Sequence, residues 1–347
     1  MATAEQTHGG PDVYVAGYEK NAHGRKVATL WKNGETHYLG VAPKDLRVSY
    51  CSEAWSVFVS DADVYVAGTE DGVATLWKNG IAQQISCGSF AEASSIFVSG
   101  GDVYVVGNSR KYAEYTPTLI GPLSASTVQY IKSSPGDECE VATLWKNGVA
   151  QRLTDGASDS YAMSVFVAGE NVYVAGVYES HPNAQGNWVL EATLWKNGSP
   201  QTLSENCYGV AFSVFVSGKD VYVAGREESA EGTFATLWKN GEAQRLGEGE
   251  ATSVFVSGED VYVAGNEDVQ GKWVATLWKN GVAQHLNDMN GAGWKISVFV
   301  SSGDVYVVGS TSIGKYNGQR VCVCKNGITK TIGTVGNFAE AYSVFVK

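Results

Sequence analysis

The chain has 347 residues, 41 of them glycine, and a formal net charge of −11 at pH 7. This charge argues against a nucleic-acid ligand, because proteins that bind nucleic acid present a basic stripe to the phosphates. No stretch approaches the ~18 consecutive apolar residues of a membrane span, so we expect no membrane insertion. The first residues, MATAEQTHGG, lack the basic segment and apolar core of a signal peptide. The compartment therefore stays open: cytoplasmic as written, or secreted or periplasmic if a signal peptide has been removed.

One unit, clearest at Ser253 to Leu286, is repeated along the chain. It reads SVFVSGEDVYVAG, then a short variable piece, then VATLWKNGVAQHL. This pattern predicts four short strands: a (SVFV), b (VYVAG), c (ATLW) and d (AQHL). Strand a begins at Ser56, Ser95, Ser164, Ser213, Ser253, Ser297 and Ser343, and strand b at Val13, Val64, Val103, Val172, Val221, Val261 and Val305. Four strands in roughly 40–50 residues is the period of a β-propeller blade.

The two ends of the repeat array complement each other. The array opens on strand b at Asp12–Gly17 and stops on strand a at Ser343–Val346. A ring closes if this last strand completes the first blade, which removes two exposed sheet edges. We therefore predict an all-β fold: a seven-bladed β-propeller with four antiparallel strands per blade. Residues 12–347 form this single domain, residues 1–11 are a flexible N-terminal segment, and residues 108–140 are an insert in the third blade.

The constant part of the repeat predicts turns and packing. The Asn-Gly of each KNG favours a two-residue hairpin turn, because both central residues need a positive φ. One tryptophan recurs just before this turn, at Trp31, Trp77, Trp145, Trp195, Trp238 and Trp278. We interpret these side chains as packing between blades rather than as ligand contacts.

The connections differ in how much they vary. The a–b and c–d turns stay short, whereas the b–c and d–a connections change in length from blade to blade. In an antiparallel blade these two variable connections emerge on the same face. Ligand sites on rigid scaffolds concentrate in variable loops, so we expect any site on this face, around the central channel.

Acidic residues recur on the variable connections. Glutamates follow the strand-b glycine at Glu19, Glu70, Glu179, Glu227 and Glu267, and precede strand a at Glu53, Glu92, Glu250 and Glu340. We expect both sets around the mouth of the channel. They indicate either a ligand site, with calcium or acid–base chemistry as possibilities, or a solvated acidic rim that keeps the protein soluble.

Aromatic residues recur on the same connections. The candidates for ligand contact are Trp55, Tyr161, Phe212, Trp294 and Tyr342, with Trp188 and Trp273 placed just ahead of strand c. Aromatic rings beside carboxylates suit a sugar, which stacks its apolar face on the ring and hydrogen-bonds through its hydroxyls. The alternative is that these rings plug the mouth of the channel as core.

Six cysteines complete the inventory of reactive side chains. The sequence does not decide whether Cys51, Cys87, Cys139 and Cys207 form disulfides with one another. Cys322 and Cys324 replace the Thr and Trp of strand c in the last copy, VCVCKNG. No histidine or second cysteine pair stands near Cys322 and Cys324, which favours packing over a metal site. We expect no cofactor, with calcium as the one open possibility.

The repeat SVFVSGxDVYVAG…ATLWKNGxAQxL resembles the highly repetitive bacterial β-propeller arrays. The resemblance covers about residues 12–347. It implies a propeller similar in architecture to WD-type and Kelch propellers, and no defined activity.

We find no G-x-S-x-G elbow, Cys/His pair or phosphate loop in the sequence. The first functional hypothesis is therefore a non-catalytic, monomeric binding module that holds a carbohydrate or protein ligand on its variable face. The second is a hydrolase or lyase acting on polysaccharide, with a site built from loops of several blades. The third is a structural scaffold for protein interactions.

Overall fold

The computed structural model describes residues 10–40, 51–86, 90–110, 118–119, 128–129, 139–182, 188–204, 207–289, 295–313, 318–333 and 338–347. The fold is all-β: within these ranges the helical structure is one turn of 3-10 helix, η2 (Asn287–Met289). Residues 1–9 of the expected N-terminal segment, and most of the expected 108–140 insert, lie outside the described residues.

The described strands fall into the four expected classes. Strand a corresponds to β4 (Ser52–Ser60), β8 (Ala91–Ser99), β14 (Ser160–Ala168), β18 (Gly209–Ser217), β25 (Ser297–Ser301) and β29 (Ala339–Val346). Strand b corresponds to β1 (Val13–Lys20), β5 (Asp63–Glu70), β9 (Asp102–Arg110), β15 (Asn171–Pro182), β19 (Asp220–Ser229), β22 (Asp260–Asp268) and β26 (Asp304–Ile313).

Strands c and d follow, and the separate d strands are short, with four or five residues. Strand c corresponds to β2 (Lys26–Lys32), β6 (Val73–Lys78), β12 (Glu140–Lys146), β16 (Trp188–Lys196), β20 (Gly232–Lys239), β23 (Trp273–Lys279) and β27 (Gly318–Lys325). Strand d corresponds to β3 (Glu35–Tyr38), β7 (Ile81–Gln84), β13 (Val149–Arg152), β17 (Ser199–Thr202), β24 (Val282–His285) and β28 (Ile328–Ile332). Inside the insert, β10 (Thr118–Leu119) pairs with β11 (Val128–Gln129).

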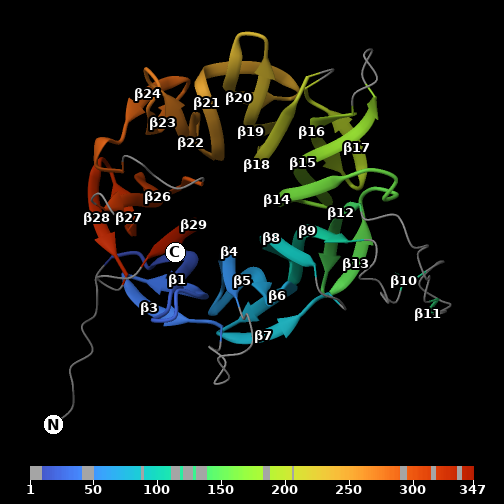
Figure 1. The fold of residues 1–347 in the computed structure, drawn as a ribbon, viewed down its shortest axis with the longest axis horizontal. Coiled ribbons are helices and arrows are strands. Elements are labelled where there is room, and N and C mark those ends of the chain that lie inside the picture. Colours follow the sequence, from blue (N-terminus) through green and yellow to red (C-terminus); the bar gives the residue numbers. More distant parts are fainter. Residues whose placement is uncertain are drawn as a thin grey trace.

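These strands form antiparallel sheets in the order a-b-c-d. Five sheets have four strands, and one of the five is β29-β1-β2-β3, in which the C-terminal strand pairs with the first, Val346 opposite Val13. A sixth sheet has seven strands, because β21 (Glu242–Ser257) is long enough to serve as strand d of one group and strand a of the next. Figure 1 shows the sheets following one another around a common centre, with β29 (red) beside β1 (blue).

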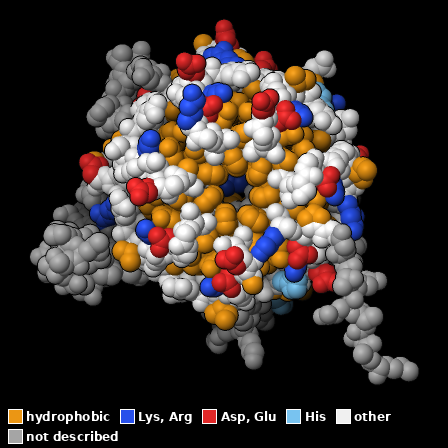
Figure 2. All heavy atoms as spheres, turned by 180° about the vertical axis from the view of Figure 1, so that it is seen from behind, with side chains coloured by type: hydrophobic (Ala, Val, Ile, Leu, Met, Phe, Trp, Pro, Cys, Tyr) orange, Lys and Arg blue, Asp and Glu red, His pale blue; other side chains and the backbone are white. Residues whose placement is uncertain are grey.

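The a strands face the centre and contact one another in chain order, and β29 in turn contacts β4. Their phenylalanines touch in the same order, with ring centroids 4.7–4.9 Å apart: Phe58, Phe97, Phe166, Phe215, Phe255, Phe299, Phe345 and again Phe58. These rings are partly exposed. On the face drawn in Figure 2, hydrophobic side chains surround a central hollow in which a basic side chain is visible, and the other charged side chains lie farther out.

Most a strands contain a β-bulge just before the repeated serine, and the serine links one sheet to the next. Trp55, for example, is an extra residue, so Ala54 pairs with Gly68 and Ser56 with Ala67. Past the bulge, the backbone N–H of Val57 donates to Ser343 Oγ of the preceding sheet (3.3 Å), and the N–H of Ile96 donates to Ser56 Oγ (3.3 Å). The serines therefore join neighbouring sheets, because each hydroxyl accepts from an outward-facing N–H of the edge strand in the next sheet.

The repeated tryptophans pack between sheets, as the sequence predicts. Each of the six is at most 1% exposed. Trp77 lies in a cluster with Tyr14, Leu30 and Leu39 of the preceding sheet, and Trp145 packs on the preceding sheet in the same way. The cores are thus interfaces between neighbouring sheets, which explains why both faces of strands b and c are apolar.

The KNG turns also behave as predicted, and they fix the end of strand b. In the second copy, Asn79 and Gly80 both have positive φ, 51° and 79°. Asn79 Oδ1 accepts from the N–H of Val64 (2.9 Å), while Asn79 Nδ2 and Lys78 Nζ lie 2.8 and 2.7 Å from the carboxylate of Asp63. The same arrangement recurs in the other copies, with Asn171 in place of aspartate in the fourth. This end of the molecule is uniform because the sequence there is uniform.

Candidate functional site

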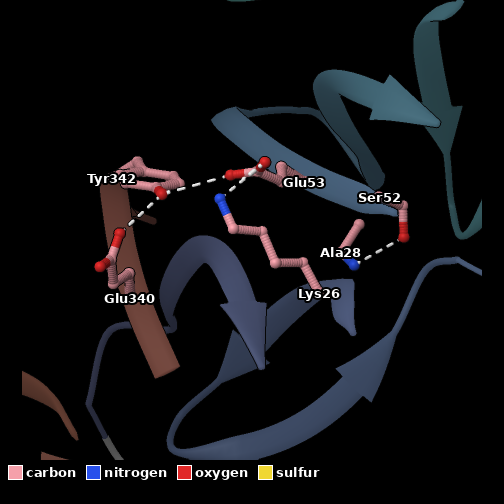
Figure 3. Close-up of polar contacts among 6 residues, drawn as sticks. All are labelled: Lys26, Ala28, Ser52, Glu53, Glu340 and Tyr342. Carbon is pink, nitrogen blue, oxygen red and sulfur yellow. Dashed lines mark hydrogen bonds and ion pairs between the residues drawn. The ribbon is translucent and has the colours of Figure 1, made fainter. Parts of the chain in front are cut away.

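Three of the expected residues meet a lysine that was not predicted, beside the a strands at the opposite end from the KNG turns. We call Lys26, Glu53, Glu340 and Tyr342 the mouth cluster; it joins β2, β4 and β29 (Figure 3). Lys26 Nζ lies 3.0 Å from Glu53 Oε1. The Tyr342 hydroxyl donates to Glu340 Oε2 at 2.8 Å and lies 3.3 Å from Glu53 Oε2. Beneath it, the N–H of Ala28 donates to Ser52 Oγ (2.9 Å), which fixes β2 against β4.

Aromatic rings fill the space around the mouth cluster. The rings of Trp55 and Tyr342 stack with centroids 4.2 Å apart and planes 18° apart, and Tyr18 lies 6.0 Å from Tyr342. Lys295 Nζ lies over the Trp55 ring, 5.1 Å from its centroid. Trp55 and Tyr342 are therefore engaged with side chains of the same chain, as expected for rings that plug the mouth.

The polar groups at the mouth are strongly perturbed. Removal from water raises the pKa of Tyr342, and the charges of Glu340 and Glu53 raise it further. Removal from water lowers the pKa of Lys295 to about 8, against the opposing effect of Glu92. Loss of solvation likewise raises the pKa of Glu92, and the charges of Glu140 and Glu53 raise it further. The centre is thus a poorly solvated environment for charge.

The glutamates of strand b do not gather at the mouth, contrary to expectation. Glu19 is 1% exposed and its carboxylate lies 3.3 Å from Trp31 Nε1 and 2.9 Å from the Tyr38 hydroxyl. Glu267 lies 2.8 Å from His285 Nε2 on β24. Both glutamates stand two residues after the strand-b glycine. At this position their side chains point toward strands c and d, away from the centre.

The remaining candidates are separate from one another. Glu227 is half-buried, and loss of solvation raises its pKa; Glu70 and Phe212 are also half-buried. Tyr161 is half-buried, and burial beside Asp159 raises its pKa to about 12. Trp294 lies outside the described residues, as does the side chain of Trp188.

A pocket of about 250 Å³ opens among the b–c loops and the d–a connection of the seven-stranded sheet. We call it the outer pocket. Its lining comprises Arg226, Glu231, Gly232, Thr233, Glu248, Gly249, Glu250, Asp268 and Trp273. Glu250 belongs to the same repeat position as Glu53, so this pocket lies on the end of the sheets that carries the mouth cluster.

The shortness of the d–a connection shapes the outer pocket. In the sequence GEGEA the chain passes from strand d to strand a without leaving β21. Gly249 has φ 135°, and a Cβ there would lie 2.1 Å from the carbonyl oxygen of Asn266. Only glycine allows this close approach of β21 to β22, which brings Glu248 and Glu250 to the same pocket.

Most charges of the outer pocket are already paired. Arg226 forms an ion pair with Glu250, Glu231 lies 3.2 Å from Arg245, and Asp268 accepts from the N–H of Gly271 at 2.7 Å. Glu248 is exposed and, within the described part of the chain, its carboxylate has no hydrogen-bond or ion-pair partner. Trp273 beside it is 50% exposed. One free carboxylate and one accessible indole ring thus share a concave site.

The sequence pattern singled out Glu250 and noted Trp273, but missed Glu248, Glu231 and Asp268. Glu231 and Glu248 belong to neither set of recurring glutamates, so a search for recurring residues passes over them; Asp268 has a counterpart in Asp71, which was not considered. The available signal was the shortness of the GEGEA connection, along which the chain stays in β21.

Several classes of site are not found in the described ranges. No group of three or more His, Cys, Asp or Glu side chains there is arranged to hold a metal ion. Cys51, Cys139, Cys207, Cys322 and Cys324 are free thiols, and Cys87 lies outside the description. Nor does any described helix have the length and apolar character to cross a membrane.

Comparisons with known proteins give structural likeness alone. No protein-family model matches the chain, and no curated protein matches it either. An acylaminoacyl peptidase of Pyrococcus horikoshii is similar to it with a TM-score of 0.49 and 14% identity, over 96% of this chain and 52% of the peptidase. The chain thus spans about half the length of that enzyme.

Two glycoside hydrolases are also similar in structure. One is a thermostable family-43 glycoside hydrolase, with a TM-score of 0.38 and 11% identity over 80% of this chain and 92% of the hydrolase. The other is an exo-1,5-alpha-L-arabinanase from a bovine ruminal metagenomic library, with a TM-score of 0.38 and 10% identity over 81% of this chain and 98% of the enzyme. At these TM-scores the likenesses assign neither a family nor an activity.

Proposed function

We propose that the chain is a seven-bladed β-propeller that binds a carbohydrate, without catalysis, in the outer pocket of its variable face. The observation that carries the proposal is the half-exposed ring of Trp273 beside the unpaired carboxylate of Glu248. Large exposed aromatic rings in concave sites are typical of ligand contacts. The pairing of β29 with β1, and the phenylalanine contacts that return from Phe345 to Phe58, support the closed ring.

The two groups suit the two surfaces of a sugar. The face of a pyranose ring is largely C–H and packs on an aromatic plane, whereas the ring edge carries hydroxyl donors. Trp273 offers such a plane, and the carboxyl oxygens of Glu248 are free to accept hydrogen bonds. The carboxylates of Glu231, Glu250 and Asp268 make the surroundings acidic. We therefore expect an uncharged oligosaccharide in preference to an acidic one.

The outer pocket replaces the mouth cluster as the favoured site because its aromatic ring is accessible. Trp55 and Tyr342 stack on each other, and Lys295 lies over Trp55. A sugar would have to displace these contacts at the mouth, whereas Trp273 has no ring or cation contact among the described residues. For a protein ligand, the other expectation from the sequence, we find no feature among the described residues comparable to Trp273 beside Glu248.

A glycan array with the purified protein, run with and without calcium, tests this function. We expect binding to neutral glycans that is weakened at least tenfold by Trp273→Ala and unchanged by Trp55→Ala. Loss with Trp55→Ala alone would move the site to the mouth. An array with no signal in either condition would contradict carbohydrate binding, and release of reducing ends from a bound glycan would show the hydrolase alternative instead.

A further inference from the structure

One interface between sheets differs from the others in what fills it. In the interface between β1–β3 and β4–β7, the indole of Trp77 is buried against Tyr14, Leu30 and Leu39, with Val64 and Val66 beside it. The corresponding tryptophans fill the other interfaces in the same way, each with an exposed fraction of 0–1%. Each indole is thus held in a slot that the preceding sheet builds for a planar ring.

The interface between β22–β24 and β25–β28 lacks the indole, and the buried side chain of Met289 fills one end of the slot. A Cβ on Gly309 would lie 3.1 Å from the Met289 methyl, where a Cβ on Gly68 would lie 2.9 Å from the indole of Trp77. Tyr262, Leu277 and Leu286 stand where Tyr14, Leu30 and Leu39 stand in the first interface, and Val305 and Val307 replace Val64 and Val66. Cys324 takes the position of Trp77, because the last copy of strand c reads VCVCKNG. These six residues, Tyr262, Leu277, Leu286, Val305, Val307 and Cys324, define what we call the interface pocket.

The missing ring leaves space. The interface pocket has a volume of about 290 Å³ and opens past the polar side chains of Lys279, Gln284 and Asn326. A buried apolar cavity of about 150 Å³ is sufficient to take up benzene. The interface pocket therefore has room for a two-ring aromatic molecule, and its walls are those that hold an indole ring elsewhere in the same protein.

We propose that the interface pocket binds a planar aromatic molecule of the indole class, which inserts its ring into the part of the tryptophan slot that Met289 leaves open. The ring gains the contacts with Tyr262 and Leu277 that Trp77 makes with Tyr14 and Leu30. Any polar substituent of the ligand extends toward Lys279, Gln284 and Asn326 at the opening. This site is separate from the outer pocket and does not depend on carbohydrate binding.

Binding of 5-fluoroindole, followed by ¹⁹F NMR, tests the proposal with the intact chain. We expect one binding site in the wild-type protein, lost in Cys324→Trp, in which the new side chain occupies the slot. Cys324→Leu fills the slot partly and keeps the interface apolar, so it should weaken binding at least tenfold. This variant replaces Cys324→Trp in the test if Cys324→Trp does not fold. Trp278→Ala should add a second site, because it empties an equivalent slot.

Three results would overturn the proposal. Equal binding to wild type and both Cys324 variants would place the probe elsewhere on the surface. Binding to Trp278→Ala but not to wild type would show that the interface pocket does not accept the ring. No binding to either protein at millimolar probe would show that these slots, once emptied, take up no aromatic ligand at all.

Discussion

The two ends of the sheets differ in how they use the repeat. At the KNG end, Asp63, Lys78 and Asn79 form one polar arrangement that recurs with nearly the same distances around the molecule. At the other end each connection differs, and the groups there are assembled from neighbouring sheets, as the mouth cluster is from two. The repeated residues thus form a rigid frame, and the residues that differ from copy to copy form the candidate binding groups.

If the repeated part is the frame, its most buried residue should be the least replaceable. We expect Trp77→Ala to lower the free energy of unfolding by about 3–5 kcal/mol, because it empties a slot around a fully buried ring. Cys324→Ala, at the same position of the interface that lacks tryptophan, should cost less than about 1.5 kcal/mol. Urea unfolding measures both; equal costs would remove the distinction between filled and open interfaces.

The bulge gives a second, smaller contrast between copies. A Cβ on Gly68 would lie 2.0 Å from the carbonyl oxygen of Glu53 and 2.9 Å from Trp77, because the bulge at Trp55 brings β4 close to β5. The pairing of β25 with β26 has no register shift, and a Cβ on Gly309 would meet the Met289 methyl at 3.1 Å and Ile296 at 3.5 Å, with the nearest backbone oxygen, that of Lys295, at 3.8 Å.

We therefore expect Gly68→Ala to destabilise the protein by about 1–3 kcal/mol, and Gly309→Ala by clearly less. A flexible methionine yields more easily than a backbone carbonyl. Thermal unfolding of the two variants side by side checks this. A greater loss for Gly309→Ala would mean that the bulge does not set the requirement for glycine.

The polar end should respond to acid. Hydrogen bonds from Lys78 and Asn79 hold the pKa of Asp63 below its ordinary value. The folded state therefore releases this proton more readily than the unfolded chain. Its contribution to stability is complete above the ordinary aspartate pKa of about 3.9 and is lost as pH falls through the lower folded pKa.

The same direction holds at Asp12, Asp102, Asp220, Asp260 and Asp304, so the free energy of unfolding should fall steadily below about pH 4. Asp63→Asn, for which Asn171 is the natural precedent, should fold normally and show a slightly shallower decline. Urea titrations at pH 3, 4 and 7 measure it; a steeper decline in the variant would contradict the direction of the shift.

The sequence was sufficient for the parts governed by local chemistry. Asn-Gly turns, apolar strands and buried tryptophans follow from residue type and spacing, and the structure confirms them for Asn79, Gly80 and Trp77. The direction of a side chain within the repeat was harder to predict. Glu19 near the last residue of β1 and Glu53 near the first residue of β4 stand at the same end of their antiparallel sheets. Even so, Glu19 turns toward Trp31 and Glu53 toward Lys26.

The outer pocket was predicted only in part because it depends on how two neighbouring loops meet. Glu250 was found through its repeat position, whereas Glu248 owes its place to the continuous strand β21 and to the close approach at Gly249. Such features depend on three-dimensional register, which a comparison of copies does not contain.

The most direct test of the account is calorimetric titration of a neutral oligosaccharide, chosen from the array, into wild type, Trp273→Ala, Glu248→Gln and Ile81→Ala. Ile81 is 76% exposed and follows a KNG turn, so Ile81→Ala removes an exposed apolar side chain from the uniform end. We predict at least a tenfold loss of affinity for Trp273→Ala, which is about 1.4 kcal/mol, a smaller loss for Glu248→Gln, and none for Ile81→Ala. Unchanged affinity in Trp273→Ala would contradict the outer pocket as the binding site.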